Sequence, residues 1–256
     1  MKKNIIYNWD CIEILQKQID ANSIDLIFAD PPYNLSWNGL HWKGNKTGWD
    51  WFMINEERDK MTAPEYMQFT RKRIAACHKV LKDNGSIYIA CSYHNIWEVM
   101  IVLKQLDYKI NNIITWYKTN AMPNMTRRVF THATEFVVWA VKGSWWKFNY
   151  EKLKEINPEK QKDWSLKQMR DLWEIPLVQW KERLKDKNWK TIHPTQKPEE
   201  MLKRIILASS DQWDIVLDPF LGSWTTAFVA QKYGRDFIWV EKDKKYFEAS
   251  KKRLGL

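Results

Sequence analysis

The stretch IDLIFADPPYN, residues 24–34, decides the fold of this chain. Its apolar run, residues 24–29, predicts a buried strand that delivers a carboxylate, two rigid prolines and an aromatic ring to its carboxyl end. An open α/β sheet binds its ligand at that edge. For an Asp-Pro pair alone, a simple turn after a strand would be the better interpretation. The complete sequence DPPY is rare in a chain of this length, and we therefore predict that residues 30–34 form the edge of an active site.

The composition fits one α/β domain with an insertion. The chain has 256 residues, of which 45% are apolar, enough to fill a sizeable core. Lysine and arginine number 41 against 31 acidic residues, which gives a net charge of +10, and the excess is spread along the chain. Such a charge favours a polyanionic partner, above all nucleic acid. A basic, soluble protein without that partner is the alternative.

Cys11, Cys77 and Cys91 show no metal-binding spacing and predict the reduced thiols of a cytosolic protein. The five histidines are scattered, so no metal site is predicted. The amino-terminal residues become polar before a signal-peptide core can form, and no apolar run reaches the length that spans a membrane. We therefore expect a cytoplasmic protein with no membrane partner.

Predicted strands and helices alternate along the chain, which favours a doubly wound, mostly parallel sheet. Strands are predicted at residues 5–7, 23–29, 86–90, 110–117, 135–141, 214–217 and 236–240, and helices at residues 10–18, 63–81, 95–106, 199–209, 225–233 and 244–254. Residues 35–60 form a long polar loop of the kind that covers an active site. Residues 142–190 have only a weak helical pattern around 165–172 and no strong strand, and we interpret them as an inserted module.

A second strand-turn-helix unit lies near the carboxyl terminus, at residues 214–226, which read DIVLDPFLGSWTT. Such a turn directs backbone amides and the amino terminus of a helix toward a cofactor. Glu241 ends the following strand, where its carboxylate can accept both hydroxyls of a ribose. Either feature alone is more simply explained by a capping or solvated carboxylate. Together they predict a cofactor site.

With these residues, the chain resembles the beta group of DNA amino-methyltransferases, in which the DPPY motif comes first and the S-adenosylmethionine turn last. Residues 30–33 match the catalytic motif, residues 218–226 match the DPFxGSGTT cofactor turn, residues 193–198 match the HPTQKP segment, and residues 8–11 resemble an amino-terminal GDC segment. The resemblance covers nearly the whole chain. It implies a Rossmann-like class I S-adenosylmethionine-dependent methyltransferase, with a catalytic domain at residues 1–141 and 191–256 and a target-recognition region at residues 142–190.

The resemblance also assigns individual residues. It assigns catalysis to Asp30, Pro31, Pro32 and Tyr33. It assigns the binding of S-adenosyl-L-methionine to Asp10, Cys11, Thr195, Lys197, Asp218, Pro219, Phe220, Gly222, Ser223, Trp224, Thr225, Thr226, Glu241 and Lys242. It assigns DNA contacts to Asn34, Lys43, Lys46, Asn120, Asn124, Arg127 and Arg128. For the four basic residues of this last set, a solvated surface charge is the alternative.

The chemistry of the DPPY residues suits methyl transfer to an exocyclic amine. The sulfonium donor is already electrophilic, so the enzyme must make the amine nucleophilic and hold it in line. Hydrogen bonds from the amine to the Asp30 carboxylate and the Pro31 carbonyl would favour a pyramidal nitrogen, and the two prolines restrict the backbone that carries this carbonyl. Tyr33 offers a ring face on which an extruded base can stack, since the duplex hides the target amine. Cytosine C5 methylation would need a thiolate, usually on a Pro-Cys pair, and no cysteine here follows a proline.

Tryptophan and glycine have exchanged their usual abundances. The chain has 17 Trp and 8 Gly, where average usage would give about 18 glycines. Tryptophan stands where the family pattern has glycine at Trp9, Trp180, Trp189, Trp213, Trp224 and Trp239. The codon UGA is read as glycine in some lineages and as tryptophan in others, so we hypothesise that the natural protein has glycine at most of these positions. A deliberately altered chain is the rival explanation.

The tryptophans bear directly on the predicted cofactor turn. As the chain is written, the Trp224 indole is expected to fill the cofactor's place, and Trp213 is expected to strain the preceding turn.

We predict a DNA methyltransferase that acts on adenine N6, because the family tends to carry Asp in this motif for adenine and Ser for cytosine. Two alternatives stay open. One is methyl transfer to cytosine N4, and the other is a DNA-binding protein that has lost catalysis because of the tryptophans. Double-stranded DNA is the expected partner. A homodimer and a cognate restriction endonuclease are further partners that the resemblance allows.

Overall fold

The computed structural model describes residues 2–35, 60–124, 127–179, 182–183, 195–222 and 224–254. The strands are β1 (Ile5–Tyr7), β2 (Ile24–Ala29), β3 (Leu81–Cys91), β4 (Lys109–Tyr117), β5 (Thr134–Val141), β6 (Leu172–Glu174), β7 (Ile215–Asp218) and β8 (Asp236–Val240). The helices are α1 (Cys11–Lys17), α2 (Ala63–Val80), α3 (Ile96–Gln105), α4 (Tyr150–Ile156), α5 (Glu199–Ser209), α6 (Thr225–Lys232) and α7 (Lys244–Leu254). The predicted alternation of strands and helices is confirmed.

The strands form one eight-stranded sheet in the order β1-β8-β7-β2-β3-β5-β4-β6. Only β5 runs antiparallel, against β3 on one side and β4 on the other. The chain passes from β2 to its neighbour β3, whereas β7 returns to the other side of β2. The strand order therefore reverses between β2 and β7, and doubly wound sheets bind ligands at the carboxyl ends of the strands at such a reversal.

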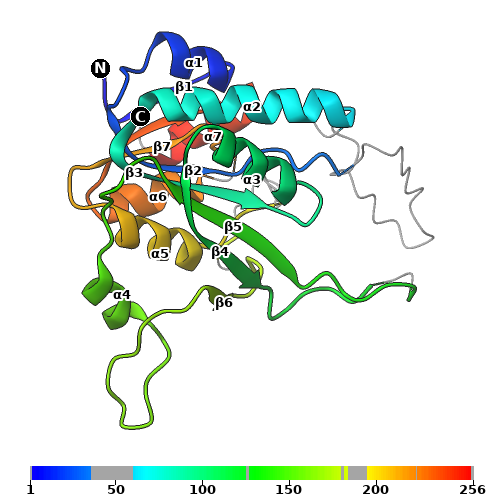
Figure 1. Ribbon diagram of the computed structural model, residues 1–256, viewed down its shortest axis with the longest axis vertical. Helices are drawn as coiled ribbons and strands as arrows, with labels where there is room; N and C mark the ends of the chain where they lie inside the picture. The colour runs from blue at the N-terminus through cyan, green and yellow to red at the C-terminus, as the bar shows by residue number, and fades with distance from the viewer. Residues whose placement is uncertain are drawn as a thin grey trace.

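Two hydrophobic clusters lie on opposite faces of this sheet (Figure 1). Helices α1, α2 and α3 supply the first cluster, and α5 and α6 supply the second. The buried strand β2 contributes to both clusters, because successive side chains of a strand point to opposite faces. Ile27 and Ala29 belong to the first cluster, and Leu26 and Phe28 belong to the second. This double burial explains the continuous apolar run before Asp30.

Two sequence predictions were wrong in detail. Helix α2 ends at Val80 because Leu81 is already extended, with φ −71° and ψ 134°, and β3 runs through Asn84 and Gly85, although this pair predicts a helix stop. In the predicted insertion, the helix lies at α4 and not at residues 165–172. The short strand β6, which the sequence did not predict, pairs in parallel with β4 at the sheet edge. Figure 1 shows α4 and the loop after it extending away from the sheet.

Most of the predicted loop at residues 35–60 lies outside the described residues, so its role as a cover stays a prediction. No helix in the described part of the chain is both long and apolar enough to cross a membrane.

Candidate active site

Four predicted site carboxylates follow four neighbouring parallel strands. Asp10 follows β1, Glu241 follows β8, Asp218 ends β7 and Asp30 follows β2. Because parallel strands share one carboxyl edge, the DPPY segment and the cofactor turn meet at the reversal between β2 and β7. The structure thus brings the catalytic and cofactor predictions together at one edge of the sheet.

The Asp30 carboxylate uses its two oxygens differently. The Lys197 ammonium lies 2.9 Å from Oδ1, and the Tyr33 hydroxyl donates to the same oxygen over 3.1 Å. No donor among the described residues reaches Oδ2. One oxygen is therefore fixed by the protein, and the other is left as an acceptor at the sheet edge.

A second carboxylate, Glu135 of β5, joins this cluster. Its Oε2 accepts from the Tyr33 hydroxyl over 3.3 Å and lies 3.7 Å from the Lys197 ammonium. Its Oε1 accepts from the Lys118 ammonium over 3.3 Å. The resemblance implies that residues 131–135, which include Glu135, flank the target base, but no individual role was predicted for Glu135 or Lys118. Both are charged residues at the strand ends that flank the loop at residues 118–133. Lys197, which we predicted to bind the cofactor, contacts the catalytic carboxylate instead.

The cluster keeps its donors protonated. Burial alone would lower the pKa of Lys197, but the carboxylates of Asp30 and Glu135 raise this pKa above its ordinary value. Burial raises the pKa of Tyr33 well above its ordinary value, and the nearby negative charges of Asp30 and Glu135 raise it further. Lys197 is therefore a cation and Tyr33 a neutral hydroxyl at neutral pH.

The loop after β2 is held by polar contacts from α2 and the segment before α3. The Tyr66 hydroxyl donates to the Pro32 carbonyl over 2.8 Å, and the Asn95 amide donates to the Tyr66 hydroxyl over 2.8 Å. Both Tyr66 and Asn95 are buried. The preceding carbonyl, that of Pro31, takes no hydrogen bond from the described residues. It remains an acceptor on the residue that follows Asp30.

The cofactor turn is tied to β8 by the Glu241 carboxylate. The Gly222 amide donates to Glu241 Oε2 over 2.9 Å, and the Asp243 amide donates to Glu241 Oε1 over 2.7 Å. Asp218 accepts from the Phe220 amide over 2.9 Å. The binding of the ribose hydroxyls by Glu241 stays a prediction.

The charges of this edge fit a cationic ligand. The pKa of Asp218 is raised to about 7, mainly by burial and also by the negative charges of Asp30 and Glu241. Hydrogen bonds from Thr226 and from the Phe220 amide act in the opposite direction and lower this pKa. A cation placed among these carboxylates would relieve their repulsion. The sulfonium and ammonium groups of S-adenosylmethionine are such cations, so the residues present suit the predicted cofactor.

The remaining predicted cofactor residues take varied positions. Asp10 caps α1 by accepting from the Ile12 amide over 3.0 Å, and the Lys242 ammonium lies 3.8 Å from its other oxygen. The Cys11 thiol is buried, and burial raises its pKa to about 12, so it is inert as a nucleophile. The Thr225 hydroxyl donates to the Lys197 carbonyl over 2.9 Å. Thr195 and Pro219 lie in turns beside these elements, whereas Ser223 lies outside the described residues.

Tryptophans in and near the cofactor turn have an unfavourable backbone. Trp224 has φ +60° and Trp213 has φ +69°, and Trp164 in the insertion has φ +65°. A positive φ is an outlier for a bulky residue and ordinary for glycine. The strain predicted at Trp213 is thus present.

The indoles of Trp224 and Trp239 are buried in the second cluster. Neither indole N–H has a hydrogen-bond partner among the described residues. The Trp224 indole therefore lies in the core, and not in the open turn where we expected it to fill the cofactor's place. Trp9 is 58% exposed, and Trp180 and Trp189 lie outside the described residues.

Two residues predicted to contact DNA have structural partners instead. Asn34 is buried, and its amide group exchanges two hydrogen bonds of 2.9 Å with the backbone of Met61. Asn120 makes the same two-way contact with the backbone of Leu177, at 3.3 Å and 2.6 Å. Each side chain joins a loop to a distant segment, so the structure gives both a structural role.

Three of the other predicted DNA contacts lie on the loop between β4 and β5, which projects beyond the body of the protein (Figure 1). Arg127 and Arg128 are exposed on this loop, and Asn124 is partly exposed. Lys43 and Lys46 lie outside the described residues. The contacts of these five residues with DNA stay predictions.

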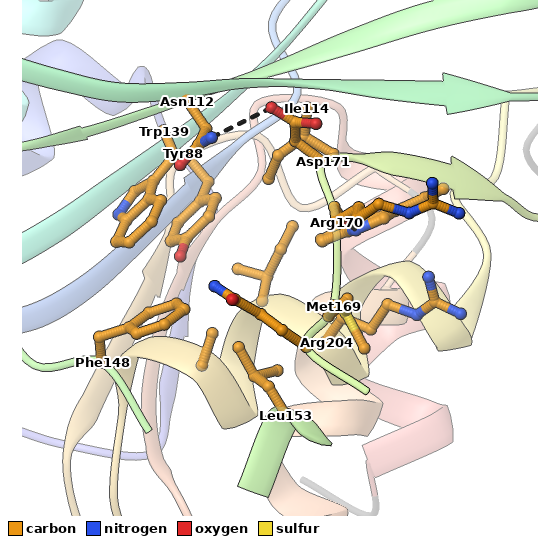
Figure 2. Close-up of a pocket in the computed structure, with 14 residues that line it drawn as sticks. Tyr88, Asn112, Ile114, Trp139, Phe148, Leu153, Met169, Arg170, Asp171 and Arg204 are labelled. Atoms are coloured by element: carbon orange, nitrogen blue, oxygen red, sulfur yellow. Dashed lines mark hydrogen bonds between the residues drawn. The ribbon is translucent and has the colours of Figure 1, made fainter. Parts of the chain in front are cut away.

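A cavity of about 380 Å³ lies away from this edge, between the sheet and helix α5 (Figure 2). Tyr88, Trp139 and Phe148 line one side with stacked rings, and Asn112 donates to Asp171 at another. None of its lining residues was predicted for the site. Among the described residues, no group of three His, Cys, Asp or Glu side chains is arranged to hold a metal ion.

The fold and this edge together define a Rossmann-like α/β methyltransferase, a class in which a cofactor turn and a catalytic strand end meet. The chain belongs to the N6_N4_Mtase family of DNA methylases, whose model matches residues 24–252. It is 42% identical over 260 residues to the Type II methyltransferase M2.LlaDCHI of Lactococcus lactis subsp. cremoris, covering 98% of this chain and 89% of that one.

Two further comparisons agree with this assignment. The Type II methyltransferase M2.DpnII of Streptococcus pneumoniae is 41% identical over 261 residues, covering 98% of this chain and 90% of that one. The crystal structure of an M1.HpyAVI–SAM complex matches with a TM-score of 0.65 and 30% identity, covering 98% of both chains. The predicted family and fold class are therefore confirmed.

Proposed function

We propose that this DNA methyltransferase transfers the methyl group of S-adenosylmethionine to the exocyclic N6 of an adenine extruded from duplex DNA. The observation that carries the proposal is the division of the Asp30 oxygens. Lys197 and Tyr33 occupy Oδ1, while Oδ2 and the Pro31 carbonyl have no donor among the described residues. These two acceptors, which come from consecutive residues, match in number the two N–H bonds of an amino group.

These acceptors account for the activation of the amine. Hydrogen bonds to Oδ2 of Asp30 and to the Pro31 carbonyl hold both hydrogens, so the nitrogen lone pair points away from them. The bound cofactor supplies an electrophilic methyl group on a sulfonium. The N–C bond would form as the bond between sulfur and the methyl group breaks, which would leave a neutral thioether and a nitrogen with one proton too many. Oδ2 of Asp30 would receive this proton. Lys197 stays protonated beside Oδ1 and compensates the negative charge of the carboxylate.

The cofactor side of the proposal rests on carboxylates and backbone amides. Glu241 and Asp218 lie at the ends of β8 and β7, where Glu241 would bind the ribose and Asp218 the positive charge of the cofactor. The M1.HpyAVI structure, whose chain is 30% identical to this one, is a complex with SAM, which supports this ligand for the present chain.

Labelled methyl transfer to duplex DNA, followed by nucleoside analysis, tests the proposal. N6-methyladenine is the expected product. N4-methylcytosine would favour the cytosine alternative, which the resemblance leaves open. Binding of DNA without any methylated product would favour the impaired protein, for which the positive φ of Trp224 is the supporting observation.

We also propose that the natural protein has glycine at position 224 and at most of the other positions where tryptophan stands in place of the glycine of the family pattern. Two of these tryptophans, Trp213 and Trp224, hold backbone conformations that suit glycine. Sequencing the gene tests this: UGA at these positions agrees with the hypothesis, and UGG at position 224 contradicts it.

Residues 142–190 are proposed to recognise the target sequence within a catalytic domain of residues 1–141 and 191–256. The support is that α4 and the following loop extend from the sheet (Figure 1), while β6 anchors the segment to β4. Exchanging this segment for that of the Lactococcus relative should change the methylated sequence, as read by methylation-sensitive sequencing. An unchanged sequence would contradict the assignment. Three further points stay predictions. Light scattering would test for a homodimer, inspection of the neighbouring genes for a cognate endonuclease, and cell fractionation for a cytoplasmic location.

A further inference from the structure

Glu135 links three parts of the chain at the catalytic edge. Its Oε1 is 3.3 Å from the Lys118 ammonium, just beyond the end of β4. Its Oε2 is 3.3 Å from the Tyr33 hydroxyl and 3.7 Å from the Lys197 ammonium. Glu135 itself does not contact Asp30. It contacts both of the donors that occupy Asp30 Oδ1.

The position of Lys197 depends on both carboxylates. Its side chain is only 6% exposed, and its ammonium lies between Asp30 and Glu135. A buried ammonium needs its full set of partners, because an unpaired buried charge is strongly unfavourable. With Glu135 present, the ammonium is drawn to the Oδ1 side of Asp30. Without Glu135, nothing among the described residues would prevent it from bridging both oxygens of Asp30.

The charges of the cluster also balance. Asp30 and Glu135 supply two negative charges, and Lys118 and Lys197 supply two positive charges. Loss of the Glu135 charge would leave one excess positive charge beside Asp30, which would strengthen the hold of Lys197 on that carboxylate. Oδ2 of Asp30 would then become a weaker acceptor for an incoming amine.

We propose that Glu135 is a positioning residue for methyl transfer, which holds Lys197 and Tyr33 on one oxygen of Asp30 and so keeps the other oxygen open to the target amine. This inference rests on the proposed function, in which Asp30 receives that amine. Glu135 acts through other residues and does not touch the substrate.

The first experiment compares Glu135→Gln with Glu200→Gln in the full chain. Glu200 is a matched control, because its two oxygens also pair with two cations, Arg204 at 3.0 Å and Lys203 at 3.2 Å, on helix α5. For Glu135→Gln we expect kcat to fall about 10- to 100-fold, since the acceptor is misplaced, while KM for DNA and Kd for S-adenosylmethionine stay within about twofold. Glu200→Gln should leave all three constants unchanged. A normal kcat for Glu135→Gln would overturn the inference.

A double variant separates position from net charge. Lys118→Met added to Glu135→Gln removes the excess positive charge without restoring the contacts to Lys197 and Tyr33. We expect kcat to stay low. Recovery of kcat would overturn the positioning role, because net charge alone would then be sufficient.

A crystal structure of Glu135→Gln tests the position of Lys197 without an activity assay. We expect the Lys197 ammonium to shift toward Oδ2 of Asp30, and an unmoved Lys197 would overturn the inference. Asp30→Asn distinguishes this failure from that of the proposed function. If Asp30→Asn keeps its methyl transfer activity, the proposed function fails. If Asp30→Asn is inactive while Glu135→Gln is normal, only the role of Glu135 fails.

Discussion

The loop after β2 and the turn after β7 both use a left-handed residue, but only one of them has a suitable side chain. Asn34 has φ +55° and Trp224 has φ +60°. Asparagine tolerates this conformation, and the amide of Asn34 is bonded in both directions to Met61. Trp224 is bulky, and its buried N–H has no partner among the described residues.

The difference shows where the sequence and the fold disagree. At the DPPY edge, residue type, backbone conformation and hydrogen bonding all agree, as expected for a chain that specifies its structure. At the cofactor turn, the backbone has the conformation of glycine while the sequence has tryptophan. The conflict is confined to one side of the active site, so the two sides should respond differently to substitution.

The largest effect is expected at the DPPY edge. Asp30→Ala removes the acceptor for the target amine, so methyl transfer should fall about 10³-fold, while binding of DNA stays within about twofold. Asp83→Ala is the control, because this carboxylate is 81% exposed and its ion pair is with Lys142, away from the site. Single-turnover assays with labelled cofactor would measure the effect. If Asp30→Ala kept its methyl transfer activity, the DPPY edge and the cofactor turn would no longer be expected to respond differently to substitution.

The cofactor turn should improve when its tryptophan is replaced. Trp224→Gly relieves the left-handed strain, and we expect Kd for S-adenosylmethionine to fall about 5- to 30-fold if about 1–2 kcal/mol of strain limits binding. Trp224→Ala removes the indole but keeps a β-carbon at positive φ, so its gain should be smaller. Isothermal titration calorimetry would measure Kd for S-adenosylmethionine in the unaltered protein, Trp224→Gly and Trp224→Ala. Equal gains for Ala and Gly would assign the defect to the indole and not to the backbone.

The affinity for the cofactor should depend on pH through Asp218. The pKa of Asp218 is raised to about 7, so the carboxyl is half protonated near neutrality. A cationic ligand favours the carboxylate, so affinity should rise with pH through about 7 and then level off. Calorimetry between about pH 5.5 and 8.5 tests this. Asp218→Asn should abolish the slope, and a slope that persists would assign it to another group.

The raised pKa of Asp218 also determines how the stability of the folded protein changes with pH. The folded protein keeps the Asp218 proton at pH values where the unfolded chain, with a pKa near 3.8, has lost it. The contribution of Asp218 to the free energy of unfolding should therefore fall as pH rises from about 4 to about 7. Chemical denaturation of the wild-type protein and of Asp218→Asn along this range would measure the difference.

The smallest effect is expected at Trp213, which is 74% exposed with φ +69°. Trp213→Gly loses little burial and relieves the strain, so the free energy of unfolding should rise by about 0.5–1 kcal/mol. Trp97→Gly is a matched control, because Trp97 is 69% exposed but helical, in α3. That change should cost about 1 kcal/mol. Thermal denaturation would show two shifts of opposite sign, and shifts of the same sign would contradict the argument from φ.

The sequence predicted most of the elements because their signals are local. The apolar runs of β2 and β7 and the capping box of α2, where Thr62 and Glu65 bond each other, lie within a few residues. Strand β6 was missed because, unlike the apolar β1, it ends in a charged residue and follows charged residues, and its pairing with β4 depends on a fold that brings Leu172 beside Thr115. The start of β3 was missed because Asn84 and Gly85 favour a turn in isolation.

The site was predicted in part for the same reason. DPPY and the cofactor turn are contiguous motifs, so their residues could be named from the sequence. Glu135 reaches Tyr33 and Lys197 from β5, and Lys118 reaches Glu135 because β4 and β5 pair antiparallel. The contact of Asn34 with Met61 could not be predicted, because the two residues are 27 positions apart in the chain.

The tryptophans that stand where the family pattern has glycine bear on the movement of this gene between organisms. If UGA encodes them, beginning with Trp9, a host that reads UGA as a stop would end translation at position 9, after Asn8 and before α1. Such a host would make none of the sheet beyond β1. Expression of the unaltered gene in it should give no full-length band on an immunoblot, and a full-length band would contradict the codon hypothesis. A gene of this kind would be silent after transfer into most other genomes, so its host range would be set by the genetic code.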